Sequence, residues 1–62
     1  MHKYVVVMNK TRQYSQGEYG FNTEDEVWKF LESLNPYELE QVTDIQKYNA
    51  RSWRCVYNEF FE

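Results

Sequence analysis

Residues 23–36 read TEDEVWKFLESLNP, and this stretch decides the fold because it defines an amphipathic helix together with both of its ends. Thr23 precedes Glu26 by three residues, the spacing of a capping box in which each side chain bonds the other residue's backbone N–H. Apolar residues then recur at i, i+3, i+4 and i+7, namely Val27, Phe30, Leu31 and Leu34. Trp28 lies about 100° around the helix from the start of this stripe, and therefore at its border.

A second, shorter helix is predicted directly after the first. Proline disfavours the α conformation of the residue before it, so Asn35-Pro36 ends the first helix. Asn35 as N-cap, Pro36 in the first helical position and Glu38 three residues after the cap form a start signal for the next one. We expect one or two turns over residues 36–41, with Leu39 and Val42 facing inward.

Strands are predicted on both sides of the helices. Residues 3–9 are rich in Val and carry apolar side chains on both faces, which favours a central strand. Residues 42–48 and 53–57 read as two further strands, joined by a hairpin loop over 49–52. Residues 12–15 and 18–21, with a tight turn at Gln16-Gly17, are predicted as a second strand or a loose hairpin arm, and Gly20 as a bulge or bend.

The predicted fold class is α+β, with the order β(β)–α–short α–β–β. We expect a single domain over residues 1–62, built as a small two-layer structure. One layer is a three- to four-stranded antiparallel sheet, and the other is the amphipathic helix.

Composition argues against an enzyme. The chain has twelve aromatic residues but one His and one Cys. Nucleophilic catalysis needs a nucleophile beside an oriented base, and His2 with Cys55 is the only such pair. A structural zinc site needs about four ligands, and an internal disulfide needs a second Cys. We therefore expect no catalytic residues, no metal and no cofactor.

Charge is unevenly distributed along the chain, and its acidic segment is typical of helix N-termini, where the helix dipole favours carboxylates. Residues 22–40 hold six carboxylates against Lys29 alone, a balance of −5, whereas residues 1–21 balance to +2 and residues 41–62 to zero. The N-terminal apolar run has five residues, too short for a signal-peptide core or a membrane span. With one unpaired Cys, this predicts a cytoplasmic protein without membrane contact.

The chain has many Tyr and Trp residues and few side chains suited to catalysis. This combination predicts a protein-binding module. An inhibitor or adaptor of the kind used by phages and mobile elements is the expected role. The predicted binding residues are Glu24, Trp28, Glu32, Phe60 and Phe61. In a sharper version of this reading, the acidic residues Glu24, Asp25, Glu32, Glu38 and Glu40 imitate the phosphates of DNA.

The alternative is a nucleic-acid-binding accessory domain. Aromatic side chains flanked by cations hold single strands. Tyr14, Tyr19 and Phe21 lie near Lys10 and Arg12, and the candidate contact residues near the C-terminus are Lys47, Tyr48, Arg51, Trp53 and Arg54. Seven basic residues against ten acidic ones count against this reading.

The apolar end Phe60-Phe61 leaves two possibilities open. It forms a twofold homodimer interface, helped by an unpaired sheet edge, or it folds back over the sheet of a monomer.

Residues 19–23, Tyr-Gly-Phe-Asn-Thr, followed by an acidic-capped helix, resemble the end of the small β-sheet arm-binding domain of tyrosine recombinases. In those domains a strand ends in Gly-Phe-x-Thr before a helix. The resemblance covers about fifteen residues. Those domains are basic, whereas this helix is acidic and is followed by two more predicted strands, so no DNA-contacting residue is carried over.

Overall fold

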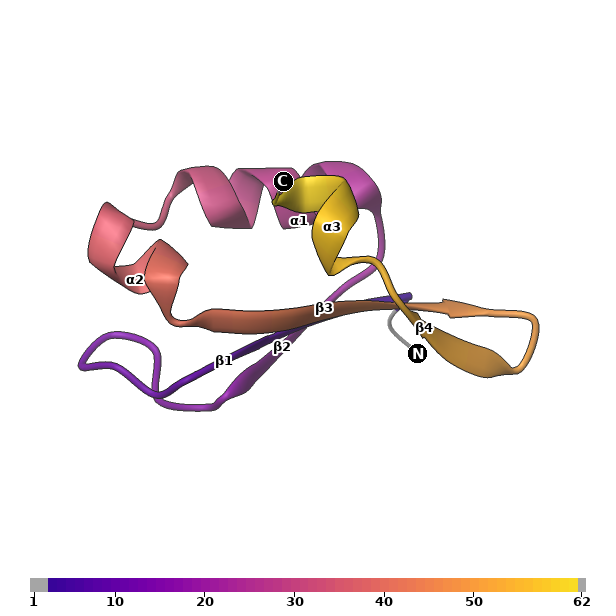
Figure 1. The fold of residues 1–62 in the computed structure, drawn as a ribbon, viewed down its shortest axis with the longest axis horizontal. Helices are drawn as coiled ribbons and strands as arrows, with labels where there is room; N and C mark the ends of the chain where they lie inside the picture. The colour runs from indigo at the N-terminus through magenta and orange to yellow at the C-terminus, as the bar shows by residue number, and fades with distance from the viewer. Residues whose placement is uncertain (1–2, 62) are drawn as a thin grey trace.

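The computed structural model describes residues 3–61, which form a four-stranded antiparallel sheet with three short helices on one side of it (Figure 1). The strands are β1 (Tyr4–Met8), β2 (Glu18–Phe21), β3 (Val42–Asn49) and β4 (Ser52–Cys55), in the spatial order β2-β1-β3-β4. The helices are α1 (Glu24–Glu32), α2 (Pro36–Glu40) and α3 (Tyr57–Phe60). The predicted α+β, two-layer architecture is confirmed, with four strands.

The core lies between the sheet and the helices. β1 is central, as its two apolar faces predict, because it pairs with both β2 and β3. Its alternate residues Tyr4, Val6 and Met8 are buried under the helices, while Val5 and Val7 are half-buried on the other face. The remaining buried apolar side chains are Val27, Leu31, Leu34, Val42, Ile45 and Val56.

Both predicted helix starts are confirmed. The Thr23 hydroxyl accepts a hydrogen bond from the Glu26 backbone N–H (3.2 Å), and the Glu26 carboxylate accepts one from the Thr23 N–H (3.2 Å). Asn35 and Glu38 form the same reciprocal pair, at 2.8 and 3.1 Å. Each box satisfies backbone donors that the first turn of a helix leaves without partners.

A bulge in β3 lets two apolar residues three positions apart face the same way. β1 and β3 pair regularly up to Val7 opposite Asp44, after which Met8 pairs with Val42 and the register shifts. In a regular strand, residues 42 and 45 would point to opposite faces. The extra residue at this shift allows both Val42 and Ile45 to be buried.

Two predicted strand segments are corrected. Residues 12–15 belong to a loop between β1 and β2, because Thr11 and Tyr14 close a turn through their backbone (2.8 Å). β2 itself is the regular strand 18–21, and Gly20 pairs in register with Val5 rather than forming a bulge.

At the other end of the chain, β4 stops at Cys55 instead of continuing to Tyr57. Val56 is buried, and the chain then turns into α3, which lies beside α1 on the helical side of the sheet (Figure 1). Among residues 3–61, none of the helices has the length and apolar character needed to cross a membrane.

Candidate functional site

Four of the five predicted protein-binding residues meet at one apolar groove. Trp28 and Glu32 reach it from α1, while Phe60 and Phe61 reach it from the C-terminal end. Leu31 and Leu39 complete its walls, and the groove encloses about 230 Å³. The Trp28 and Phe60 rings pack on each other with centroids 4.8 Å apart. Sequence spacing pointed to Trp28, but the meeting of α1 with the C-terminal end depends on tertiary packing.

The α1 side of the groove carries one acidic side chain, and a second lies close by on the same helix. Glu32, one turn after Trp28, is exposed and lines the groove. Glu24, the fifth predicted residue, is exposed one turn before Trp28 on the same flank of the helix, and does not line the groove itself. Trp28 retains 39% of its surface exposed, which leaves a large apolar side chain between two carboxylates.

The C-terminal aromatic residues fold back within the chain. Phe60 packs on Trp28, and Phe61 stacks on Tyr57 with ring centroids 4.8 Å apart. Both residues are half-buried against the core. They therefore lie among the helices, not across the free face of the sheet.

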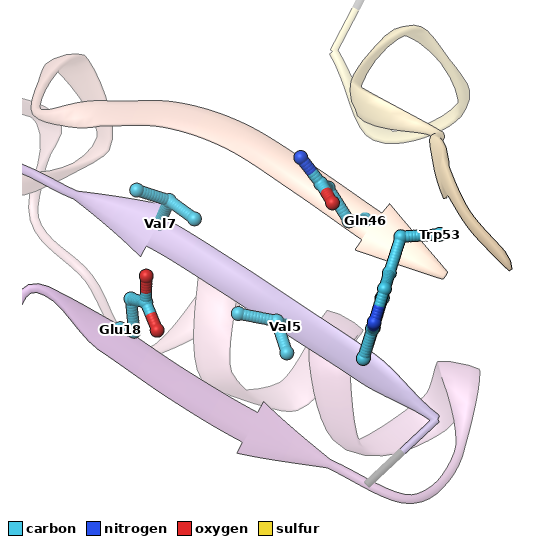
Figure 2. Close-up of a pocket in the computed structure, with 5 residues that line it drawn as sticks. All are labelled: Val5, Val7, Glu18, Gln46 and Trp53. Atoms are coloured by element: carbon cyan, nitrogen blue, oxygen red, sulfur yellow. The ribbon is translucent and has the colours of Figure 1, made fainter. Parts of the chain in front are cut away.

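The sheet face opposite the helices has a second hollow of about 290 Å³ (Figure 2). It is lined by Val5 and Val7 of β1, Glu18 of β2, Gln46 of β3 and Trp53 of β4. In Figure 1, none of the described elements lies over this face, which we call the open face. The sequence signal for this surface is the presence of apolar residues on both sides of β1, although none of the predicted protein-binding residues lies on it.

A polar network stands at one end of the open face, around Asp44. Its carboxylate accepts hydrogen bonds from Gln46 Nε2 (2.7 Å), the Ile45 N–H (2.9 Å) and Cys55 Sγ (3.1 Å). The hydrogen bond from Gln46, with those from Cys55 and Ile45, lowers the pKa of Asp44 against the opposing effect of burial. Cys55 is exposed and directs its thiol at this carboxylate.

The predicted nucleic-acid-binding residues are divided between the two faces. Register places Tyr48 opposite Trp53 and Lys47 opposite Arg54, and neighbouring residues of a strand point to opposite sides. Tyr48 and Trp53 share the open face, with ring centroids 5.2 Å apart. Lys47 lies on the helical side, 5.6 Å from the centre of the Tyr4 ring, and Arg54 shares that side.

Arg51, the remaining member of that group, stands at the β3–β4 turn, exposed. The aromatic residues of the N-terminal half are engaged elsewhere. Tyr14, Tyr19 and Phe21 each pack against Phe30 of α1, with ring centroids 5.1–5.6 Å apart. The predicted cations Lys47 and Arg54 therefore do not share a face with the predicted aromatic residues Tyr48 and Trp53.

The acidic residues proposed to imitate phosphates are not all displayed. Glu38 is 5% exposed, because its carboxylate is used in capping α2. Within residues 3–61, no three His, Cys, Asp or Glu side chains gather as a metal-binding group. His2, the base considered for Cys55, lies outside the described residues.

Comparisons of this chain with models of known protein families, with curated proteins and with solved structures found no match.

Proposed function

We propose that this chain is a non-enzymatic protein-binding module, acting as an inhibitor or adaptor, and that the apolar groove beside Trp28 is its docking site. One observation carries the proposal: four residues selected from sequence as binding residues line a single groove, although they come from two separate parts of the chain. An exposed Trp at the edge of an apolar depression is the kind of residue that dominates binding energy at protein interfaces.

The groove favours a partner of particular chemistry. Its walls are aromatic and aliphatic, so an aromatic or large aliphatic side chain fits there. Glu24 and Glu32 flank Trp28, and the segment 22–40 has a charge of −5. We therefore expect a partner segment with one apolar anchor and neighbouring Lys or Arg residues, which gain favourable electrostatic energy at this rim.

Selection from a random peptide library tests the proposal. The wild-type domain should enrich peptides that combine an apolar anchor with basic residues. Trp28→Ala should weaken binding of a selected peptide about tenfold or more, because a Trp at an interface hot spot contributes about 2 kcal/mol or more. Trp53→Ala is the matched control, since it removes the other exposed Trp on the opposite side of the domain.

Two results would contradict the groove as docking site. One is enrichment of peptides whose binding is lost in Trp53→Ala and kept in Trp28→Ala. The other is no enrichment at all by a folded domain. Glu32→Lys adds an electrostatic check, because it should weaken basic peptides selectively while leaving the apolar walls in place.

The nucleic-acid alternative has less support, because its aromatic and basic candidates lie on different faces. A titration with fluorescent single-stranded oligonucleotides separates the two functions. We expect no saturable binding at physiological salt. Saturable binding lost in Arg51→Ala would favour the alternative.

A further inference from the structure

The open face carries charges of opposite sign at its two ends. At one end, Val7 of β1 lies between Glu18 of β2 and Asp44 of β3, its partners in the two ladders. All three share the open face, because directly paired residues point to the same side of a sheet. The Asp44 carboxyl group is ionised at neutral pH, as its pKa lies below the ordinary value of 3.8.

Lys3 lies at the opposite end of the open face. Its carbonyl oxygen accepts a hydrogen bond from the Tyr48 N–H (2.7 Å), so the chain continues the β1 register one residue before the strand. Side chains alternate along a strand, which places Lys3 on the open face with Val5 and Val7. Lys3 is exposed. The apolar centre of the face therefore lies between a basic end and an acidic end.

We propose that the open face binds the open face of a second copy of this chain, with the strands of the two copies running in opposite directions. Two sheets stacked in this way lie about 10 Å apart and share one apolar layer. That layer consists here of Val5, Val7 and Trp53, around the hollow shown in Figure 2.

The charges select one of two twofold arrangements. A twofold axis parallel to the strands would stack the acidic ends of the two copies on each other, and like charges across an interface oppose binding. A twofold axis that lies in the interface and runs perpendicular to the strands instead reverses the strand direction of the second sheet. Each Lys3 then lies over Val7 of the other copy, between Glu18 and Asp44. Symmetry makes this contact twice.

The small size of this domain favours the same arrangement. A 62-residue domain buries only about 60% of its unfolded surface, and association is one way in which small domains gain stability. The interface uses the side of the sheet away from the helices, so the groove beside Trp28 stays free. The proposal is thus independent of the proposed docking function.

Sedimentation across a dilution series, from about 10 μM to 1 mM, tests the dimer. The wild type should move from 7.7 kDa toward twice that mass as concentration rises. Lys3→Glu and Glu18→Lys should each weaken the dimer about tenfold or more, because either change places like charges together at both symmetric contacts. Both positions are exposed, so circular dichroism should show unchanged folds.

Sedimentation of an equimolar mixture of the two single variants is the decisive experiment. In the mixed dimer, Glu at position 3 of one copy meets Lys at position 18 of the other, while the remaining Lys3 meets the remaining Glu18. The mixture should dimerise with affinity near that of the wild type, while each variant alone stays monomeric at the same concentration. The double variant Lys3→Glu/Glu18→Lys should dimerise alone.

Three results would overturn the proposal. The first is a wild type that stays at 7.7 kDa up to 1 mM. The second is a dimer that neither single reversal weakens. The third is a dimer weakened by both reversals but not restored in the mixture. A dimer lost only in Phe60→Ser would assign the interface to the C-terminal aromatic residues instead.

Discussion

Asp44 is held by hydrogen bonds from Gln46, Cys55 and the Ile45 backbone, and these lower the pKa of its carboxyl group below the ordinary value of 3.8. A carboxyl group with a lowered folded-state pKa stabilises the fold above its unfolded pKa. That contribution is lost as the pH falls through the folded-state value. Asp44 therefore links the stability of the domain to acid pH.

Asp44→Asn tests this link. At pH 7 the variant should be less stable than the wild type, because hydrogen bonds to a charged acceptor are stronger than those to an amide. The two urea midpoints should approach each other as the pH is lowered from 7 to about 2.5, since the wild-type carboxylate becomes protonated below 3.8. A difference that stays constant over this range would show that the folded-state pKa is not lowered.

The two central residues of the turn between β3 and β4 adopt a backbone conformation that their residue types disfavour. Ala50 and Arg51 have φ values of +48° and +77°, between the paired residues Asn49 and Ser52. Positive φ at both central positions is the requirement of a type I′ turn, for which Asn-Gly is preferred. A side chain in this region costs about 1 kcal/mol. The hairpin forms because the cross-strand pairs beside it offset that cost.

Arg51→Gly should therefore raise the free energy of unfolding by about 0.5–1 kcal/mol, because glycine adopts positive φ without steric cost. Thermal and urea unfolding measure the change. Arg51→Lys is the control, and it should leave stability unchanged because lysine meets the same backbone restriction. A Gly variant less stable than the wild type would mean that the Arg51 side chain stabilises the turn more than its backbone strain costs.

At the scale of elements, α1 and α2 are short, with nine and five residues. Isolated helices of this length are marginal in water. Their stability comes from a complete capping box at each start and from packing against the sheet. Val27 and Leu31 of α1 are buried, as the predicted stripe requires. The helix ends at Glu32, before the predicted end at Asn35-Pro36, so Leu34 is buried from the turn that follows it. Phe30 is half-buried among the aromatic residues of β2 and the loop before it.

Removing the α1 cap should cost measurable stability. Thr23→Ala should lower the free energy of unfolding by about 1 kcal/mol, because the Glu26 N–H loses its acceptor. Thr23→Ser keeps the hydroxyl and should stay within a few tenths of a kcal/mol of the wild type. Chemical denaturation of both variants provides the measurement, and equal loss in both would exclude the cap as the cause.

At the scale of the whole molecule, the C-terminal segment connects β4 to the helical layer. Val56 is buried, and Phe60 reaches across to Trp28 of α1. The same contact forms one wall of the groove. Stability and the proposed docking site therefore share residues at this end of the domain.

Phe60→Ala should lower the free energy of unfolding by about 1–2 kcal/mol, since a half-buried aromatic side chain and its ring contact are lost. In a Trp53→Phe background, it should also shift Trp28 emission to the red and increase its quenching by acrylamide. Asn58→Ala, an exposed change in the same helix, should alter neither quantity. An unchanged Trp28 signal in Phe60→Ala would mean that α3 does not pack against α1.

Sequence by itself determined the elements whose signals are local. The two capping boxes, the stripe of α1 and the central position of β1 each depend on residues a few positions apart, so their hydrogen bonds and periodicity can be read directly. Trp28 and Glu32 were selected as candidate binding residues in the same way, from their place on the helix.

Tertiary structure alone decided the features that join distant parts of the chain. The bulge in β3 follows from the need to bury both Val42 and Ile45, which no local signal specifies. Tyr57 and Phe60 are three positions apart, the spacing of one helix face, but a single turn of four residues is too short to be predicted from sequence alone. In the folded chain this turn is α3, and it brings Phe60 against Trp28 of α1. The groove and the open face exist only after these elements are placed, since each is lined by residues from three or four of them.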